Sequence, residues 1–262
     1  MPDKKKRGRD STANTLIVAI SVSLVCSILV SASAVMLKPR QLENEDLFRK
    51  RIVLEVAGLY ESGIDVAETF TQVEPRLVEL ESGEYSDVAD PAEFDMLAAG
   101  SDPELGIAIP ATEDLAVIRR RAKYAPIFVI RDGDTIEQII LPVYGAGLWS
   151  TMYGYLSVSP DGRTVRGLQF YEHAETAGLG DQIDKPDWLA QWPGLTLFDA
   201  DGNPAIEVVR GQAPADSTHQ VDGLSGATLT ARGVTNLVHY WVGPNGFGPY
   251  LDRLAAEAAN NE

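Results

Sequence analysis

The chain has 262 residues, 45% of them hydrophobic, which is enough to bury a core of one or two domains. Its 38 acidic and 22 basic residues give a formal net charge of -16, which excludes a nucleic-acid-binding protein because such proteins need clustered Lys and Arg to neutralise phosphates. The single cysteine, Cys26, excludes an intramolecular disulfide and a thiolate metal cluster.

An uncharged apolar run covers residues 16–37 and is long enough to cross a hydrocarbon layer of about 30 Å as one helix. Five basic residues precede the run and two follow it. The excess of positive charge on the N-terminal side predicts that the basic tail, residues 1–15, lies in the cytoplasm. The rest of the chain would then lie in the periplasm, attached to a bacterial inner membrane. The alternative is a signal peptide cleaved near residues 31–34, but the length of the run favours a retained, single-pass helix.

Residues 38–118 are predicted to form a juxtamembrane helix and an acidic connecting region. Apolar residues spaced among charges favour a helix over residues 41–60, with Gly58 and Gly63 at its end. From there to Asp114 the chain is acidic and carries four prolines, which indicates short helices and loops before a core that begins late in the chain.

Strand patterns dominate residues 119–262, which are predicted as one domain. Two hairpins are expected, each with an Asp-Gly pair in its turn, because glycine accepts the positive φ that such turns require. Their strands cover residues 125–130 with 135–141 and 152–159 with 164–171, and a further strand covers 205–210. Amphipathic helices are expected at residues 227–242 and 250–259. The predicted fold is α+β, with a largely antiparallel sheet and flanking helices.

The segment most indicative of chemistry is VDGLSGATLT, residues 221–230, where a glycine-containing turn leads into the helix expected from residue 227. The free N–H groups and the positive dipole end of such a helix favour a phosphate. Ser225 is expected to cap the helix, and Gly226 would allow close approach of a ligand to the backbone. The alternative is an ordinary Ser-capped helix without a ligand, which helix physics alone favours.

Residues 222–228, DGLSGAT, resemble the recognition motif of bacterial flavin transferases, and the next two residues agree with the pattern of that family. Two other stretches match the same family, namely residues 145–156 (GAGLWSTMYGYL) and 172–180 (EHAETAGLG). Their order, the apolar N-terminal run and the chain length resemble the C subunits of the Na+-translocating NADH:quinone reductases. One departure is Ala177, where the family usually has proline, and this makes the turn less rigid.

The resemblance implies a domain that carries FMN covalently, with the FMN phosphate joined to the hydroxyl of Thr228. In the loop GLG, residues 178–180, little side-chain bulk hinders a flat ring, while Glu175 and Thr176 offer polar groups to its edge and Trp149 walls the site. The alternatives are a solvated turn for Glu175 and core packing for Trp149. The residues expected to bind the cofactor are Thr228, Ser225, Gly226, Ala227, Thr230, Glu175, Thr176, Leu179, Gly180 and Trp149.

The resemblance also implies an electron-carrying subunit of a membrane complex that oxidises NADH, reduces ubiquinone and exports Na+. Other subunits of the complex and a flavin transferase that uses FAD would be its partners. NADH, quinone and Na+ are expected to bind the other subunits, because this chain has no dinucleotide fingerprint and one helix cannot form a pore. No catalytic side chain is needed, and a metal site is not expected because the three histidines are widely separated.

Two alternatives remain, one closely similar and one of a different class. The first is the G subunit of an Rnf-type electron-transport complex, which shares the anchored flavin domain but is typically shorter. The second is a noncatalytic envelope interaction protein, in which the turn before the helix is only a cap. The acidic segment before Asp114 and the GLWSTMYGYL stretch favour the reductase.

Overall fold

The computed structural model describes residues 12–260, and the chain divides into two compact units with the boundary between Phe48 and Arg49. Most of the basic tail on which the predicted orientation rests, residues 1–11, lies outside the described residues. The division differs from the boundary expected between residues 118 and 119. The reason is that residues well before 118 contribute to the core of the second unit.

The first element, α1 (Thr12–Val56), is one helix that contains the apolar run and most of the predicted juxtamembrane helix. It is long and apolar enough to cross a membrane. Two separate helices were expected, but Pro39 lies inside α1 without ending it. Its cost of about 3 kcal/mol is outweighed by the helix-forming residues on both sides. The helix ends two residues before Gly58, whose φ of 73° is left-handed, and this confirms the predicted end.

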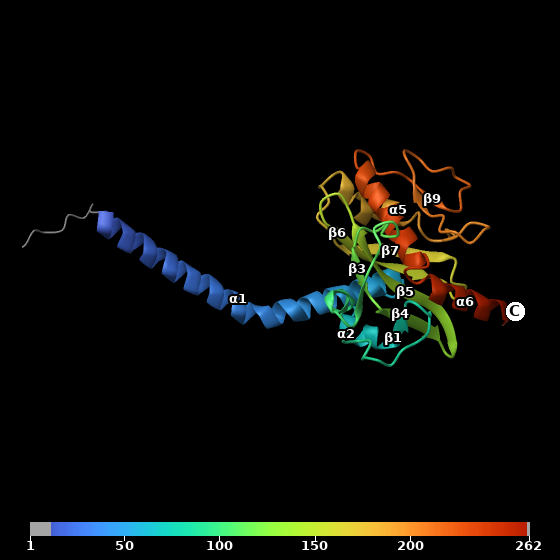
Figure 1. Ribbon diagram of the computed structural model, residues 1–262, viewed down its shortest axis with the longest axis horizontal. Helices are drawn as coiled ribbons and strands as arrows, with labels where there is room; N and C mark the ends of the chain where they lie inside the picture. The colour runs from blue at the N-terminus through green and yellow to red at the C-terminus, as the bar shows by residue number, and fades with distance from the viewer. Residues whose placement is uncertain (1–11, 261–262) are drawn as a thin grey trace, which may run out of the picture. The chain divides into compact units, whose positions relative to one another are not determined.

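Five antiparallel strands form the main sheet, in the order β1-β4-β5-β6-β7 (Figure 1). Both predicted hairpins are present, with Gly133 (φ 59°) and Gly162 (φ 66°) in their turns. The strands are β1 (Val73–Glu79), β4 (Tyr124–Asp132), β5 (Thr135–Ala146), β6 (Thr151–Val158) and β7 (Val165–Glu172). The α+β fold with a largely antiparallel sheet is confirmed.

The expectation of a late-starting core is wrong, because β1 belongs to the main sheet. It pairs with β4 along its whole length and buries Leu77 and Val78. Pro75 and the charged residues of β1 suggested a loop. A proline is tolerated there because β1 is an edge strand, in which one row of N–H groups needs no partner.

The sheet buries both of its faces, and the side chains alternate between them with the period of two that a strand imposes. One face packs against α5 (Thr228–Val242) through residues such as Ile127, Ile139 and Leu141. The other face packs against the last turns of α1, where Ile52, Val53 and Leu54 are buried. The C-terminal helix α6 (Gly248–Asn260) adds Tyr250, Leu251 and Leu254 to the first core.

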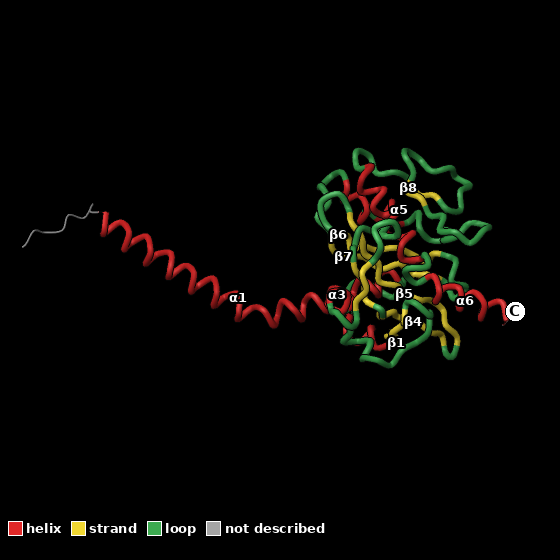
Figure 2. The backbone as a smooth tube through the Cα atoms, viewed as in Figure 1, coloured by secondary structure: helices red, strands yellow, loops and turns green. Residues whose placement is uncertain are grey.

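The remaining elements are short, and Figure 2 shows that the part of the chain around β8 is mostly loop. The strand predicted over residues 205–210 is only β8 (Glu207–Val208), which pairs in parallel with β9 (Gln220–Val221). The others are α2 (Val66–Thr69), η1 (Phe70–Gln72), α3 (Met96–Ser101), β2 (Gly106–Ala108), β3 (Arg120–Ala122), η2 (Gly180–Asp184) and α4 (Pro186–Leu189).

Candidate functional site

The turn that leads into α5 differs from the expected Ser-capped start. The N-cap is Ala227, with no side-chain hydrogen bond, and Ser225 is exposed two residues earlier. Gly226 explains this difference, because its φ of 74° is incompatible with a helix that begins directly after Ser225. The carbonyl of Ser225 instead accepts a hydrogen bond from Gln182 Nε2 at 3.1 Å, which ties the turn to η2.

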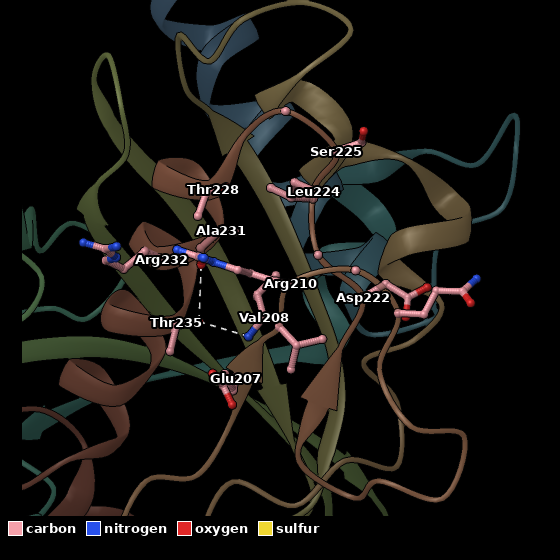
Figure 3. A pocket seen from close by; sticks show the side chains of 15 residues that line it. Glu207, Val208, Arg210, Asp222, Leu224, Ser225, Thr228, Ala231, Arg232 and Thr235 are labelled. Atoms are coloured by element: carbon pink, nitrogen blue, oxygen red, sulfur yellow. Dashed lines mark hydrogen bonds between the residues drawn. The ribbon is translucent and has the colours of Figure 1, made fainter.

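Thr228 is the first residue of α5, and its side chain is exposed. Within residues 12–260 its hydroxyl has no hydrogen-bond partner. It lies on the wall of a cavity of about 630 Å³, formed by residues 207–212, residues 222–226 and one face of α5 (Figure 3). The hydroxyl is therefore free to react with, or bind to, a group that enters this cavity.

Two arginines that the sequence reasoning missed, Arg210 and Arg232, line the same cavity as Thr228. Arg232 follows Thr228 by four residues on α5, so the helical period places both on one face. That spacing was a usable signal in the sequence. Arg210 comes from the loop after β8, and nothing in the sequence pattern brings that loop to the start of α5.

Beneath this surface, the buried carboxylate of Glu175 joins the three motif segments and is only 8% exposed. Its Oε1 accepts hydrogen bonds from the backbone N–H groups of Leu148 at 2.9 Å and Trp149 at 3.2 Å. Its Oε2 accepts one from the hydroxyl of Thr230 at 2.5 Å. A solvated turn at Glu175 is thus ruled out. Thr230, at 0% exposure, supports the start of α5 from inside.

Gly180 and His173 complete the surroundings of this carboxylate. A Cβ atom at Gly180 would lie 2.8 Å from the Cβ of Glu175 and 2.9 Å from the Oγ1 of Thr230, so only glycine fits. Nδ1 of His173 accepts the N–H of Glu175 at 3.2 Å, while Nε2 faces Asp184 at 2.6 Å. One neutral tautomer, with the proton on Nε2, satisfies both bonds.

Large apolar side chains remain exposed on the same segments, which argues against core packing for Trp149. Its side chain is 69% exposed, and its Nε1 donates to the hydroxyl of Thr176 at 3.0 Å. Leu179 is 42% exposed and lies close to Gly226. Leu148 and Leu229 are also exposed. Exposed apolar groups on segments that adjoin the turn of an exposed hydroxyl suit a ligand that has both a flat apolar part and an anionic part.

Comparison with known proteins decides the family. Residues 147–243 match the family model of the FMN-binding domain. A relative from Yersinia pestis, named as the C subunit of the Na(+)-translocating NADH-quinone reductase, is 47% identical over 266 residues, which cover 100% of both chains. A Pseudomonas aeruginosa relative of the same name is 46% identical over 94% of this chain and 97% of its own. The chain belongs to the C-subunit family of the Na+-translocating NADH-quinone reductases.

A solved structure of the C-subunit family agrees with this fold. The crystal structure of Shewanella oneidensis NqrC has a TM-score of 0.74 and 37% identity, and the match covers 79% of this chain and 96% of that one. The full-length relatives support the prediction of a reductase C subunit over the G subunit of an Rnf complex. The chain thus carries an FMN-binding domain, and the region that matches it contains Glu175, the loop of Leu179 and Thr228.

The donor set of the site fits FMN. A free hydroxyl and two guanidinium groups line the cavity, and these suit a phosphate. Exposed apolar side chains on the adjoining segments suit an isoalloxazine ring.

Proposed function

We propose that this C subunit carries electrons within a membrane NADH:ubiquinone reductase that exports Na+, and that its FMN is joined through the phosphate to Thr228. The observation that carries the proposal is the exposed, unpartnered hydroxyl of Thr228 at the end of the DGLSGAT segment, inside a domain of the FMN-binding family. Bound FMN supplies one- and two-electron redox chemistry, so the protein needs only to hold and surround it.

The residues of the three motif segments contribute to holding FMN in different ways. Ser225, Gly226 and Ala227 form the turn that presents the hydroxyl. Thr176, Leu179 and Trp149, which are exposed, provide the surface for the ring, whereas Gly180 is buried against Glu175 and allows the loop to pack closely there. Glu175 and Thr230, which the sequence suggested as ligands, hold the three segments together from inside.

A flavin transferase that uses FAD as its donor makes the link. The bond that forms joins Oγ of Thr228 to the phosphorus of the FMN moiety. The bond that breaks is the P–O bond of the FAD pyrophosphate, so AMP leaves. The hydroxyl proton passes to a base of the transferase. The exposure of Thr228 allows a second protein to reach it.

The apolar part of α1 anchors the protein in the bacterial inner membrane, with the N-terminus in the cytoplasm and the FMN-binding domain in the periplasm. The length and apolar character of α1 support the anchor, and the charge bias around it supports the direction. NADH, quinone and Na+ bind to the other subunits. A single helix cannot enclose an ion path, which supports this division.

Intact-mass spectrometry of the full chain, made together with a flavin transferase, tests the attachment site. The native chain should carry the mass of one FMN and stay yellow after denaturation, and Thr228→Ala should lose both. Thr228→Ser should regain them, because serine restores a hydroxyl at the same point. Thr230→Ala is the matched control and should keep the FMN mass, since its hydroxyl faces Glu175. FMN retained by Thr228→Ala but lost by Thr230→Ala would disprove the assignment.

A further inference from the structure

We propose that Arg210 and Arg232 act together as an arginine clamp on the phosphodiester that links FMN to Thr228. The inference rests on the proposed function and adds two positioning residues to it. It assigns a role to charged groups that lie outside the motif segments. Their side chains are exposed in the same cavity as Thr228.

Both side chains belong to the wall of the cavity that Thr228 lines. Arg232 lies one helical turn after Thr228 on α5, so its guanidinium can turn back along the helix face toward the Thr228 hydroxyl. Arg210 projects from the loop after β8, and Figure 3 shows its side chain extending across the cavity toward the face of α5 that carries Thr228, Ala231 and Arg232.

Backbone hydrogen bonds fix the loop of Arg210 to the segment of Thr228. The carbonyl of Gly211 accepts from the N–H of Gly223 at 2.7 Å, and the N–H of Val209 donates to the carbonyl of Val221 at 3.0 Å. On the other side, the N–H of Val208 donates to the hydroxyl of Thr235, on α5, at 3.0 Å. These bonds hold Arg210 near α5 without the help of a ligand.

The electrostatics leave both arginines available for an anion. Within residues 12–260 neither guanidinium forms an ion pair, whereas Arg51, Arg76, Arg131, Arg166 and Arg253 each do. The two carboxylates in the cavity wall have other partners. Asp222 accepts from the N–H of Ala213 at 2.8 Å, and Glu207 accepts from Gln220 at 3.2 Å. Within the described residues, neither carboxylate forms an ion pair with either arginine.

The chemistry of the group matches the clamp. A phosphodiester carries one negative charge shared by two free oxygens, and the planar guanidinium fork pairs with two such oxygens. Held from two sides, the phosphate cannot swing about the Thr228 side chain, and the attached ring keeps one position. Because the pairs are exposed, salt should weaken them.

The experiment uses the full chain made together with a flavin transferase and compares four variants with the native chain. These are Arg210→Gln, Arg232→Gln, the double Gln variant and the double Lys variant, with Arg166→Gln as the matched control. Arg166 is exposed, and its partner is Glu137, at 3.8 Å, outside the cavity. The readouts are intact mass, the ³¹P NMR shift of the attached phosphate, and flavin fluorescence anisotropy as a function of NaCl concentration.

In the native chain and in Arg166→Gln, anisotropy should fall as NaCl rises. Each single Gln variant should increase the fraction of attached flavin that rotates freely, with its phosphate not held by the arginines, roughly two- to five-fold. This is the size expected for one exposed ion pair. The double Gln variant should show the ³¹P shift of the unfolded chain and no response to salt. If it loses the FMN mass altogether, the double Lys variant should restore it.

The outcomes separate the two proposals. A double Gln variant with the native mass, ³¹P shift and salt response would overturn the clamp and leave the proposed function standing. FMN mass missing from the double Gln variant and also from the double Lys variant would overturn it as well, because the charge would not be the cause. A native chain without FMN mass would overturn the proposed function, and the clamp with it.

Discussion

At the scale of single residues, the buried carboxylate of Glu175 has the greatest influence on the site. A buried charge is costly unless hydrogen bonds compensate it, and Glu175 receives them from Leu148, Trp149 and Thr230. These donors come from two other segments of the motif. Their convergence explains why all three segments are needed to build one site.

We expect Glu175→Ala to lower the free energy of unfolding by about 2–4 kcal/mol, because it leaves two backbone N–H groups and one hydroxyl without their acceptor. Glu175→Gln should cost less, since an amide oxygen can still accept from Leu148 and Trp149. Urea unfolding of both variants measures the difference. The neighbouring Glu172 is exposed, so Glu172→Ala should stay within about 0.5 kcal/mol of the native chain. Equal effects of Glu175→Ala and Glu172→Ala would contradict the expectation.

The sequence allowed Thr228 to be singled out, because a contiguous motif ends on it. It did not reveal the burial of Glu175, since the bonding partners lie 26, 27 and 55 residues away and pair only through the fold. The cap at Ser225 was predicted wrongly because composition favoured serine, while the positive φ of Gly226 decided where the helix could begin.

At the scale of elements, α5 can approach β5 closely because Gly233 lies at their contact. A Cβ atom there would come within 2.6 Å of the backbone oxygen of Ala146, which cannot move aside as a flexible side chain would. Alanine usually stabilises a helix by about 1 kcal/mol over glycine, but overpacking costs about 1–3 kcal/mol. The two terms oppose each other, and the rigid backbone contact places the cost at the upper end.

Gly233→Ala should therefore destabilise the protein by about 1–2 kcal/mol net, against the direction of helix propensity. Thermal unfolding followed by circular dichroism would measure this. Asn236→Ala, on a half-buried position of the same helix, is the control and should change stability by less than about 0.5 kcal/mol. A stabilised Gly233→Ala variant would mean that α5 can shift away from β5 freely.

His239, near the C-terminal end of α5, should make the stability of the protein depend on pH. Burial lowers the pKa of His239 below its ordinary value, although the hydrogen bond from its ring to the carbonyl of Ile206 acts in the opposite direction. As the pH falls below about 6.5, His239 takes up a proton in the unfolded chain but stays neutral in the folded chain until the pH is lower. The contribution of neutral His239 to the free energy of unfolding is fully present above that pH. It is lost as the pH falls through the pKa of His239 in the folded chain.

His239→Gln should consequently flatten the loss of unfolding free energy between pH 7 and pH 5, measured by urea titration at each pH. Glutamine keeps an N–H that can donate to Ile206 but takes up no proton in this range. The pH range of this test stays above the ordinary carboxyl pKa of 4.5, so carboxyl groups add little to the profile. The pKa of Glu74 is lower still, because its carboxylate accepts a hydrogen bond from Arg131. Identical pH profiles for variant and native chain would exclude His239 as the cause.

Elements with strong local signals were predictable, and those fixed by distant partners were not. Both hairpins followed from Asp-Gly turns between apolar strands. β1 was missed because its proline and charged residues are typical of a loop. It is an edge strand that is stabilised by pairing with β4, some fifty residues later. The short parallel pair of β8 and β9 also depends on tertiary contacts.

At the scale of the whole molecule, the boundary between Phe48 and Arg49 divides α1 by environment. The apolar residues before it are exposed, whereas Ile52, Val53 and Leu54 after it are buried against the sheet. The last two turns of α1 are therefore part of the FMN-binding unit. They cover the sheet face opposite α5 together with Ile130 and Ile140.

A shortened chain that begins at Arg49 should fold as a soluble monomer, whereas one that begins at Glu61 should be severely destabilised. Loss of Ile52, Val53 and Leu54 removes three fully buried side chains, each of which contributes about 1.5–3 kcal/mol, a total close to the whole stability of many domains. Size-exclusion chromatography and urea unfolding of the two chains would test this, with Leu54→Ala in the longer one expected to cost about 2–5 kcal/mol. If the chain from Glu61 unfolds at the same urea concentration as the chain from Arg49, the end of α1 is a passive linker and the core of the domain is formed by the sheet and α5 alone.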